Sequence, residues 1–173
     1  MSSNPMLTIS LRELARGPVD LEGTVDPEEE PWKSTDLAFR EAPTFDLTAR
    51  ETGDGVVHVT GTLRAVLEVE CRRCLIPVPH AVDLTIDWLY DPGLEGEPEE
   101  EGVFPLDRES GALDITPQIR EELLLNEPPY PLCRPECEGL CPTCGTNLNE
   151  ETCECEQETG DPRWQQLYEQ LEE

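Results

Sequence analysis

The chain has 173 residues, of which 36% are hydrophobic, so it is long enough for one main hydrophobic core and a small appendage. Its 12 lysines and arginines against 39 acidic residues give a formal net charge of -27, which argues against broad electrostatic binding of nucleic acid or anionic lipid. No apolar stretch approaches the roughly 20 residues of a membrane-spanning helix, and the start MSSNPMLTIS is not a secretion signal, so a cytoplasmic protein is expected.

The N-terminal part is predicted to hold a short helix, a strand and an acidic loop. Residues 10–13 read Ser-x-x-Glu, a capping-box pattern that predicts one or two helical turns over 11–16. The Pro-bracketed acidic stretch DPEEEPWKS at 26–34 is predicted as a solvated loop, because it holds too little apolar surface to order itself.

A long period-two pattern follows and predicts half-buried antiparallel strands. Apolar residues alternate with polar ones on both sides of a predicted TGDG turn at 52–55, and again after the first cysteine pair. The residues expected on the buried face are Phe45, Leu47, Ala49, Val57, Val59, Leu63, Ala65, Leu67, Val69, Val82, Leu84, Ile86, Trp88 and Tyr90.

An acidic loop is predicted at 91–102, with short apolar pieces at 103–106 and 112–115 that add edge strands. Two helices close the chain. The first has Thr116 as its expected N-cap and Pro117 at its first position, with Ile119 and Leu123 on one face. The second begins at 161–162 and carries an apolar stripe that is expected to dock on the protein's own sheet, formed by Trp164, Leu167 and Leu171.

These elements predict an α+β fold that is mainly antiparallel β. We expect a long-stranded sheet or partly open barrel, two C-terminal helices and a zinc-knuckle segment. The expected division is an N-terminal segment at 1–43, a β core with one helix at 44–130, and a cysteine-rich zinc-binding segment with the last helix at 131–173.

Eight cysteines carry the chemistry of the sequence. In a reducing compartment, dense cysteines are typical of metal binding rather than of disulfides. CRRC (Cys71, Cys74) and CPTCG (Cys141, Cys144) are CxxC units whose two sulfurs can converge on one ion. The second unit is the more specific, because Pro142 pre-sets the turn and the glycine after it removes a Cβ where the chain folds back.

Structural zinc takes four ligands, so each CxxC unit needs two more thiols. One arrangement joins Cys141 and Cys144 to Cys153 and Cys155 across a short loop, and leaves Cys71 and Cys74 to combine with Cys133 and Cys137. A second arrangement gathers Cys133, Cys137, Cys141 and Cys144, and leaves Cys71, Cys74, Cys153 and Cys155 for the other site. In a third, only the C-terminal site binds metal and CRRC is a redox dithiol.

Neither predicted zinc site has the features of a catalytic one. Catalytic zinc keeps an open position and usually has His or carboxylate ligands, whereas four thiolates leave a closed ion. The histidines, His58 and His80, lack ligand spacing and are expected at the surface. The sequence contains no GxSxG, P-loop or dinucleotide fingerprint.

Three arginines form a small basic cluster in an otherwise acidic sequence. Arg72 and Arg73 lie inside the first CxxC unit, and Arg64 lies on the strand that leads into it. A four-thiolate zinc carries a formal charge of about -2, so charge compensation is the simpler role. The alternative is a small phosphate contact with RNA.

The string PLCRPECEGLCPTCGTNLNEETCEC at 131–155, with CRRCLIPVPH at 71–80 before it and DPRWQQL at 161–167 after it, resembles the YceD family, the large ribosomal RNA subunit accumulation proteins of bacteria and plastids. The resemblance runs from about residue 44 to residue 171. It implies a role in synthesis, processing or stability of large-subunit ribosomal RNA and implies no enzyme activity. The family's cysteine pairs correspond to Cys71 and Cys74 and to the run from Cys133 to Cys155.

The resulting prediction is a non-catalytic, zinc-stabilised protein that supports synthesis, processing or accumulation of large-subunit (23S) ribosomal RNA in ribosome biogenesis. Its expected partner is a ribosome-assembly protein or a pre-ribosomal large-subunit particle, with no membrane and no small-molecule substrate. The alternative is a redox- or zinc-responsive regulatory protein in which the CRRC pair cycles between metal and disulfide.

Overall fold

The computed structural model describes residues 7–30, 32–34, 37–94 and 101–155. Contacts divide the chain into two compact units. The sheet unit comprises Met1–Val69 and Pro77–Pro129, and the cysteine unit comprises Glu70–Ile76 and Tyr130–Glu173. The expected boundaries at 43/44 and 130/131 stay a prediction.

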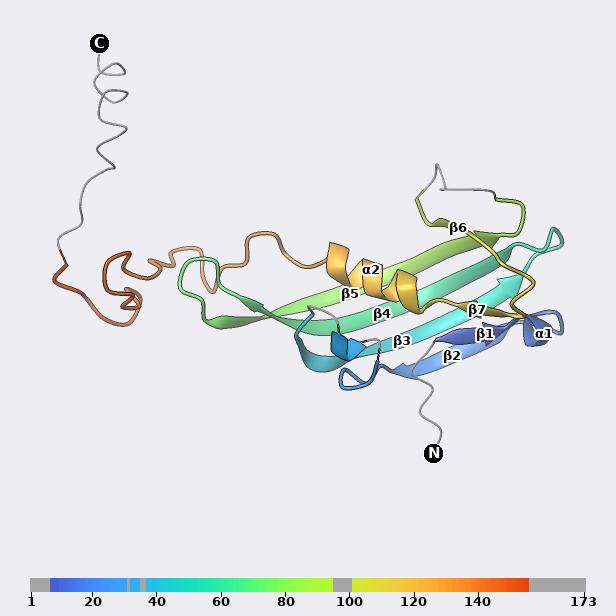
Figure 1. Cartoon of the computed structure of the whole chain (residues 1–173), viewed down its shortest axis with the longest axis horizontal. Helices are drawn as coiled ribbons and strands as arrows, with labels where there is room; N and C mark the ends of the chain where they lie inside the picture. Colours follow the sequence, from blue (N-terminus) through green and yellow to red (C-terminus); the bar gives the residue numbers. More distant parts are fainter. Residues whose placement is uncertain (1–6, 31, 35–36, 95–100, 156–173) are drawn as a thin grey trace, which may run out of the picture. The chain divides into compact units, whose positions relative to one another are not determined.

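A five-stranded sheet of order β2-β3-β4-β5-β6 forms the body of the sheet unit (Figure 1). β2 and β3 pair antiparallel, as do β3 and β4, whereas the short β6 runs parallel to the end of β5. The five strands are β2 (Val19–Thr24), β3 (Phe39–Glu51), β4 (Val57–Glu70), β5 (Pro77–Asp91) and β6 (Val103–Pro105). The predicted β-rich fold is confirmed at this level, as a mixed sheet.

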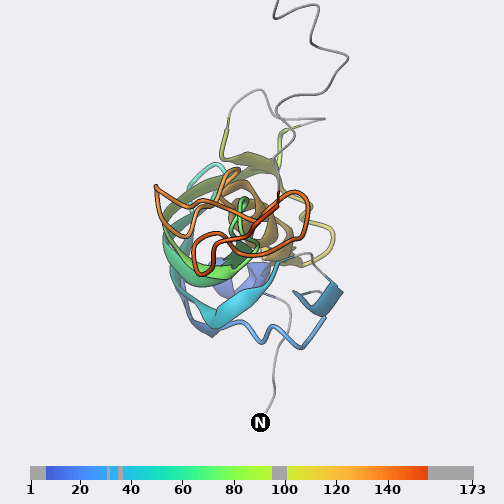
Figure 2. The ribbon, with the colours of Figure 1, turned by 90° about the vertical axis from the view of Figure 1, so that its left-hand side faces the viewer.

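The sheet is curved when seen along its strands, and it does not close into a barrel over the described residues (Figure 2). β1 (Thr8–Ser10) and β7 (Ala112–Asp114) pair antiparallel as a separate two-stranded sheet. The pieces predicted as edge strands at 103–106 and 112–115 therefore join different sheets. The short helix α1 (Leu11–Leu14) follows β1 directly, within the predicted range of 11–16.

The core of the sheet unit lies between one face of the sheet and α2 (Thr116–Leu125). The alternation in β4 puts Val57, Val59 and Leu63 on the inner face, each 0% exposed, and it continues through Leu67 to the strand end. Ile119 and Leu123 of α2 are also 0% exposed and belong to the same apolar cluster. Each such side chain contributes about 1.5–3 kcal/mol by leaving water.

The opposite face of the sheet carries polar and charged side chains. Thr48 of β3 lies opposite Thr60 of β4, and Arg50 lies opposite His58. Since side chains alternate across a strand, one face of the sheet packs in the core while the other faces solvent.

At Gly61 of β4, the backbone of the neighbouring strand β3 comes very close. Gly61 pairs with Leu47 and has a φ of 151°. A Cβ at this position would lie 2.0 Å from the backbone oxygen of Asp46, so only glycine fits.

Two local predictions for the sheet unit need correction. α2 begins at Thr116 and its N-cap is Ile115, because the Thr116 hydroxyl instead accepts a hydrogen bond from the Leu7 amide at 3.0 Å. Trp32, predicted in a solvated loop, is 2% exposed and lies in a short 3-10 helix (Trp32–Ser34). Its ring packs edge-on against the ring of Phe39, with 6.5 Å between the ring centroids. An aromatic ring buries enough area to order an otherwise acidic loop.

The α1 cap also differs from the expected capping box, since Ser10 makes no side-chain capping hydrogen bond. The second predicted C-terminal helix, at 161–173, lies outside the described residues. No helix among the described residues is long and apolar enough to cross a membrane.

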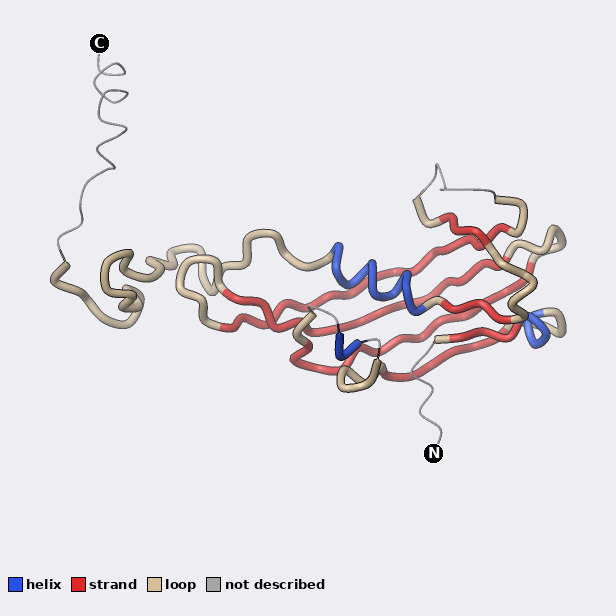
Figure 3. The backbone as a smooth tube through the Cα atoms, viewed as in Figure 1, coloured by secondary structure: helices blue, strands red, loops and turns tan. Residues whose placement is uncertain are grey.

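The described part of the cysteine unit consists of turns and loops rather than regular elements (Figure 3). Over 130–155 its one isolated β-bridge joins Leu140 and Asn147. With so little regular backbone pairing, the order of this unit depends on its side chains and turns.

Candidate metal centres

The eight cysteines of the cysteine unit form two groups of four. Within each group all the sulfur atoms lie within 4.8 Å of one another. Group 1 comprises Cys71, Cys74, Cys133 and Cys137, and group 2 comprises Cys141, Cys144, Cys153 and Cys155. These are the two sets that the first predicted arrangement gives.

Both CxxC units have the same backbone hydrogen bonds. In the first, the Cys71 amide donates to Ile76 O at 2.8 Å and the Leu75 amide donates to Cys71 O at 2.8 Å. In the second, the Cys141 amide donates to Thr146 O at 2.8 Å and the Gly145 amide donates to Cys141 O at 2.9 Å. Each CxxC motif is therefore a tight turn that folds back beneath the sulfur of its first cysteine.

The residue after the second cysteine of each turn adopts a left-handed conformation. Gly145 has a φ of 75° and Leu75 has a φ of 61°. Leu75 is the only non-glycine residue with positive φ among the described residues, and its side chain is 55% exposed. The turn geometry, rather than burial of the leucine, accounts for this strained conformation.

The sulfur separations in group 1 suit a tetrahedral ion. Cys71 Sγ lies 3.8 Å from Cys137 Sγ, and Cys74 Sγ lies 3.7 Å from Cys133 Sγ. A tetrahedron with zinc–sulfur bonds of about 2.3 Å has edges of about 3.8 Å. A disulfide needs about 2.05 Å, and all eight cysteines are free. The donor set and its spacing thus fit structural zinc in group 1.

Backbone amides favour the thiolate form of the first cysteine in each turn. Burial opposes ionisation of Cys71, but hydrogen bonds from the amides of Cys74, Arg73 and Cys133 lower the pKa of its thiol to about 6. In group 2, the amides of Cys144 and Thr143 lower the pKa of Cys141 to about 6. These donors compensate negative charge on sulfur, as a thiolate site requires.

Other thiols in each group resist ionisation. Burial and the neighbouring sulfurs raise the pKa of Cys133 to about 12. The Cys144 side chain, followed by burial, raises the pKa of Cys155 to about 12. Four crowded sulfurs cannot all carry charge by themselves, so a cation that neutralises them would displace the remaining protons.

Asn149 supports group 1 from the loop that precedes the last cysteine pair. Its Nδ2 donates to Cys137 Sγ at 3.4 Å, while its Oδ1 accepts from the Glu138 amide at 2.9 Å and from Arg134 Nη2 at 2.7 Å. Although burial opposes it, the Asn149 amide helps to lower the pKa of Cys137. The sequence prediction missed this residue, because no local spacing signals a contact with a sulfur twelve positions upstream.

Arg73 joins the first turn to the segment between the two groups. Its Nη1 donates to Cys137 O at 2.7 Å, and its own carbonyl accepts the Leu140 amide at 3.0 Å. Gly139 permits this approach, since a Cβ there would lie 3.0 Å from Arg73 O. This guanidinium contacts the backbone of Cys137, a member of group 1, and its positive charge would offset negative charge on the sulfurs.

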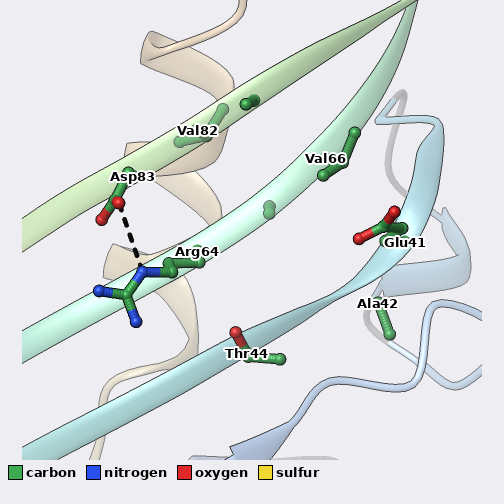
Figure 4. Close-up of a pocket in the computed structure, with 9 residues that line it drawn as sticks. Glu41, Ala42, Thr44, Arg64, Val66, Val82 and Asp83 are labelled. Atoms are coloured by element: carbon green, nitrogen blue, oxygen red, sulfur yellow. Dashed lines mark hydrogen bonds and ion pairs between the residues drawn. The ribbon is translucent and has the colours of Figure 1, made fainter.

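Arg72 and Arg64 lie in different surroundings. The Arg72 guanidinium lies 4.2 Å above the ring centroid of Tyr130, an exposed side chain of the cysteine unit. Arg64 belongs to the sheet unit, where its Nε lies 3.3 Å from Asp83 Oδ2 at a hollow of about 310 Å³ (Figure 4). Glu41 and Thr44 also line that hollow. The structure therefore does not gather the three arginines into one basic patch within either unit.

The histidines make contacts within the sheet unit. His58 Nε2 lies 2.6 Å from Asp87 Oδ1, and His80 Nε2 lies 3.2 Å from Asn126 O. Both histidines have intermediate exposure. Neither ring is a member of a cysteine group.

A family model described as "Large ribosomal RNA subunit accumulation protein YceD" matches residues 59–170. The match covers all eight cysteines and both groups that they form. No solved structure matches the chain.

Curated relatives include uncharacterized proteins of Mycobacterium bovis and Mycobacterium tuberculosis, each 36% identical over 130 residues. The aligned region is 73% of this chain and 61% of each relative. A Zea mays protein named "Large ribosomal RNA subunit accumulation protein YCED homolog 1, chloroplastic" is 29% identical over 140 residues, which are 64% of this chain and 46% of the maize protein. The chain therefore spans about half to three-fifths of the length of these relatives.

Proposed function

Because the chain belongs to the YceD family, we propose that it supports the synthesis, processing or accumulation of large-subunit ribosomal RNA in ribosome biogenesis, without catalysing a reaction. The observation that carries the proposal is the match to the family over 59–170, which includes both cysteine groups. The name of the maize relative refers to the same process.

A structural role of the cysteines supports the non-catalytic part of the proposal. Each group supplies four thiols, so a bound zinc ion would have no open position for water. No histidine or carboxylate belongs to either group in the described part of the chain. We propose that all eight cysteines, Cys71, Cys74, Cys133, Cys137, Cys141, Cys144, Cys153 and Cys155, hold two zinc ions that order the cysteine unit.

The proposed partner is a ribosome-assembly protein or a pre-ribosomal large-subunit particle in the cytoplasm, with no small-molecule substrate. The net charge of -27 favours a partner that presents positively charged protein surface over one that presents bare phosphates. Affinity purification from growing cells, with identification of the co-purifying proteins and RNA, tests this part.

Direct contact with RNA through Arg64, Arg72 and Arg73 is a weaker part of the proposal. Arg64 already pairs with Asp83, and Arg73 already binds a backbone carbonyl beside group 1. If the contact exists, Arg72→Gln with Arg73→Gln weakens binding to large-subunit RNA fragments and flattens its dependence on salt. Equal affinity and salt dependence for this variant and the parent chain would remove RNA contact from the proposal.

The regulatory alternative predicts a different response to oxidation. Cys71 is 0% exposed and its sulfur lies among three others, which favours a stable structural site over a cycling dithiol. Mild peroxide should leave the zinc content of the purified chain unchanged. Release of zinc with formation of a Cys71–Cys74 disulfide would support the regulator instead.

Depletion of the protein from growing cells tests the proposed function itself. Sedimentation profiles should show fewer large subunits and an accumulation of free small subunits, because large-subunit RNA limits assembly. Normal profiles with normal levels of both ribosomal RNAs would refute the proposal.

A further inference from the structure

The long strand β5 has an open edge. β5 covers Pro77–Asp91, but β6 pairs only with Leu89–Asp91 at its end. In the sheet order β5 lies between β4 and β6, so in the described part of the chain the preceding residues of β5 have a partner strand on one side only. An unpaired edge of this length can accept a further strand.

The direction of each backbone group follows from the bonds at the end of the strand. The Leu89 amide donates to Gly102 O at 2.8 Å, and Asp91 O accepts the Leu106 amide at 3.0 Å. Backbone groups alternate between the two edges of a strand. The N–H and C=O groups of Ala81, Asp83, Thr85 and Asp87 therefore point to the same edge as β6.

The two prolines at the start of the strand agree with this assignment. Pro77 and Pro79 have the same parity as the four edge residues, so the N–H that proline lacks would have pointed to the open edge. The side chains of the four edge residues are all exposed. A Cβ at Gly102 would lie 3.1 Å from Asp87 O, so Gly102 already lies against that carbonyl. The hydrogen-bonding run available at this edge is thus 81–85.

An apolar surface on α2 lies near the start of this edge. His80 Nε2 contacts Asn126 O at the C-terminal end of α2, and α2 runs along β5 (Figure 1). In the last turn of α2, Leu124 is 37% exposed and Leu125 is 73% exposed. An added strand with apolar residues on its inner side would cover such side chains.

The outer side of the same edge is acidic. The side chains of Asp83 and Asp87 are 69% and 74% exposed, although Asp83 pairs with Arg64 and Asp87 pairs with His58. Pairing with a second copy of the chain would bring these carboxylates close to their counterparts, and like charges across strands are destabilising. The net charge of -27 adds to that repulsion.

We propose that the open edge of β5 at 81–85 binds an extended segment of a basic protein. The segment adds a strand to the sheet, with lysines or arginines at alternate positions facing Asp83 and Asp87, and apolar residues between them facing the exposed leucines of α2. Main-chain hydrogen bonds supply affinity, and the alternating side chains supply specificity. This site lies in the sheet unit and does not depend on metal binding.

The test uses the full chain and a fluorescein-labelled eight-residue peptide in which lysine and valine alternate, with binding followed by anisotropy. The peptide should bind, while the same peptide with glutamate in place of lysine should not. Thr85→Pro removes one edge N–H and should weaken binding about tenfold, whereas Thr85→Val keeps that N–H and should bind like the parent chain. Unchanged binding by Thr85→Pro would overturn the proposal.

A charge-matched pair of variants tests the acidic side. Asp83→Asn with Asp87→Asn should weaken peptide binding about tenfold or more. Asp20→Asn with Glu22→Asn removes the same charge from β2, the strand at the other end of the sheet, and should change binding less than twofold. Equal losses in both variants would mean that the peptide responds only to net charge, which contradicts the proposal.

Amide hydrogen exchange of the parent chain provides a measurement that does not depend on variant folding. The amides of Ala81, Asp83 and Thr85 should exchange fast alone and become protected when the peptide is added. Protection before any peptide is added would mean that another part of the chain or a second copy already covers the edge. Protection by a single-stranded uridine octamer instead of the peptide would assign the edge to RNA; either result overturns the proposal.

Discussion

At the residue scale, the two CxxC turns require the same backbone conformation from two different amino acids. The position after the second cysteine is left-handed in both, and it is glycine in one turn but Leu75 in the other. A bulky residue in this conformation costs about 1–2 kcal/mol relative to glycine. The exposed Leu75 side chain recovers little of that cost through packing.

Leu75→Gly should therefore stabilise the cysteine unit by about 1 kcal/mol, and Gly145→Ala should destabilise it by about the same amount. Since nothing lies within 4 Å of a Cβ at Gly145, the control variant reports on backbone conformation alone. Zinc affinity in competition with a chelator measures both effects, because folding and metal binding are coupled. A loss of affinity in Leu75→Gly would mean that the leucine side chain contributes more than its exposure indicates.

Removal of one cysteine should empty one group and leave the other loaded. Cys71→Ser and Cys141→Ser should each reduce the zinc content from two ions to one, and the double variant should bind none, because a structural zinc ion needs four ligands. Elemental analysis with native mass spectrometry checks the stoichiometry. A single ion in the parent chain, or full loss in either single variant, would contradict two separate sites.

At the scale of elements, the alternation of apolar and polar residues predicts the long strands. Other local features, such as the helix cap and the buried loop, depend on contacts between residues distant in sequence. The period-two pattern predicted β4 with its inner face from Val57 to Val69, and the structure confirms it. Thr116 failed as a predicted cap because its hydroxyl binds Leu7, which lies 109 positions away. Local propensity cannot predict such a bond, just as it could not predict the burial of Trp32 against Phe39.

The cysteine groups were partly predictable for a similar reason. Counting four ligands per ion and preferring short loops led to the observed sets among the arrangements considered. The supporting contacts of Asn149 and Arg73 were not predictable, because they join residues across turns whose path the sequence pattern does not specify.

Gly61→Ala should prevent stable formation of the β3–β4 ladder. Its Cβ would overlap the backbone of Asp46 and Leu47, which cannot move without separating the strands, so the loss should exceed about 4 kcal/mol. Gly53→Ala, in the turn between the same strands, meets no atom within 4 Å and should cost less than about 1 kcal/mol. Urea unfolding followed by circular dichroism distinguishes the two variants. Equal urea midpoints would refute the close contact between Gly61 and the backbone of β3.

At the scale of the whole molecule, the charge of -27 acts against the compact state. Raising the salt concentration from about 10 mM to about 200 mM shortens the screening length from about 30 Å to below 10 Å. The urea midpoint should therefore rise with sodium chloride and rise by the same amount with potassium chloride. A midpoint that is insensitive to salt would mean that local ion pairs offset the repulsion.

The ratio of large- to small-subunit ribosomal RNA in depleted cells tests most directly the proposal that this protein supports accumulation of large-subunit ribosomal RNA and needs zinc to do so. The ratio should fall on depletion and recover with the parent chain. Cys71→Ser with Cys141→Ser, expressed at the same level, should fail to restore it. An unchanged ratio on depletion, or full recovery with the variant that binds no zinc, would contradict the account.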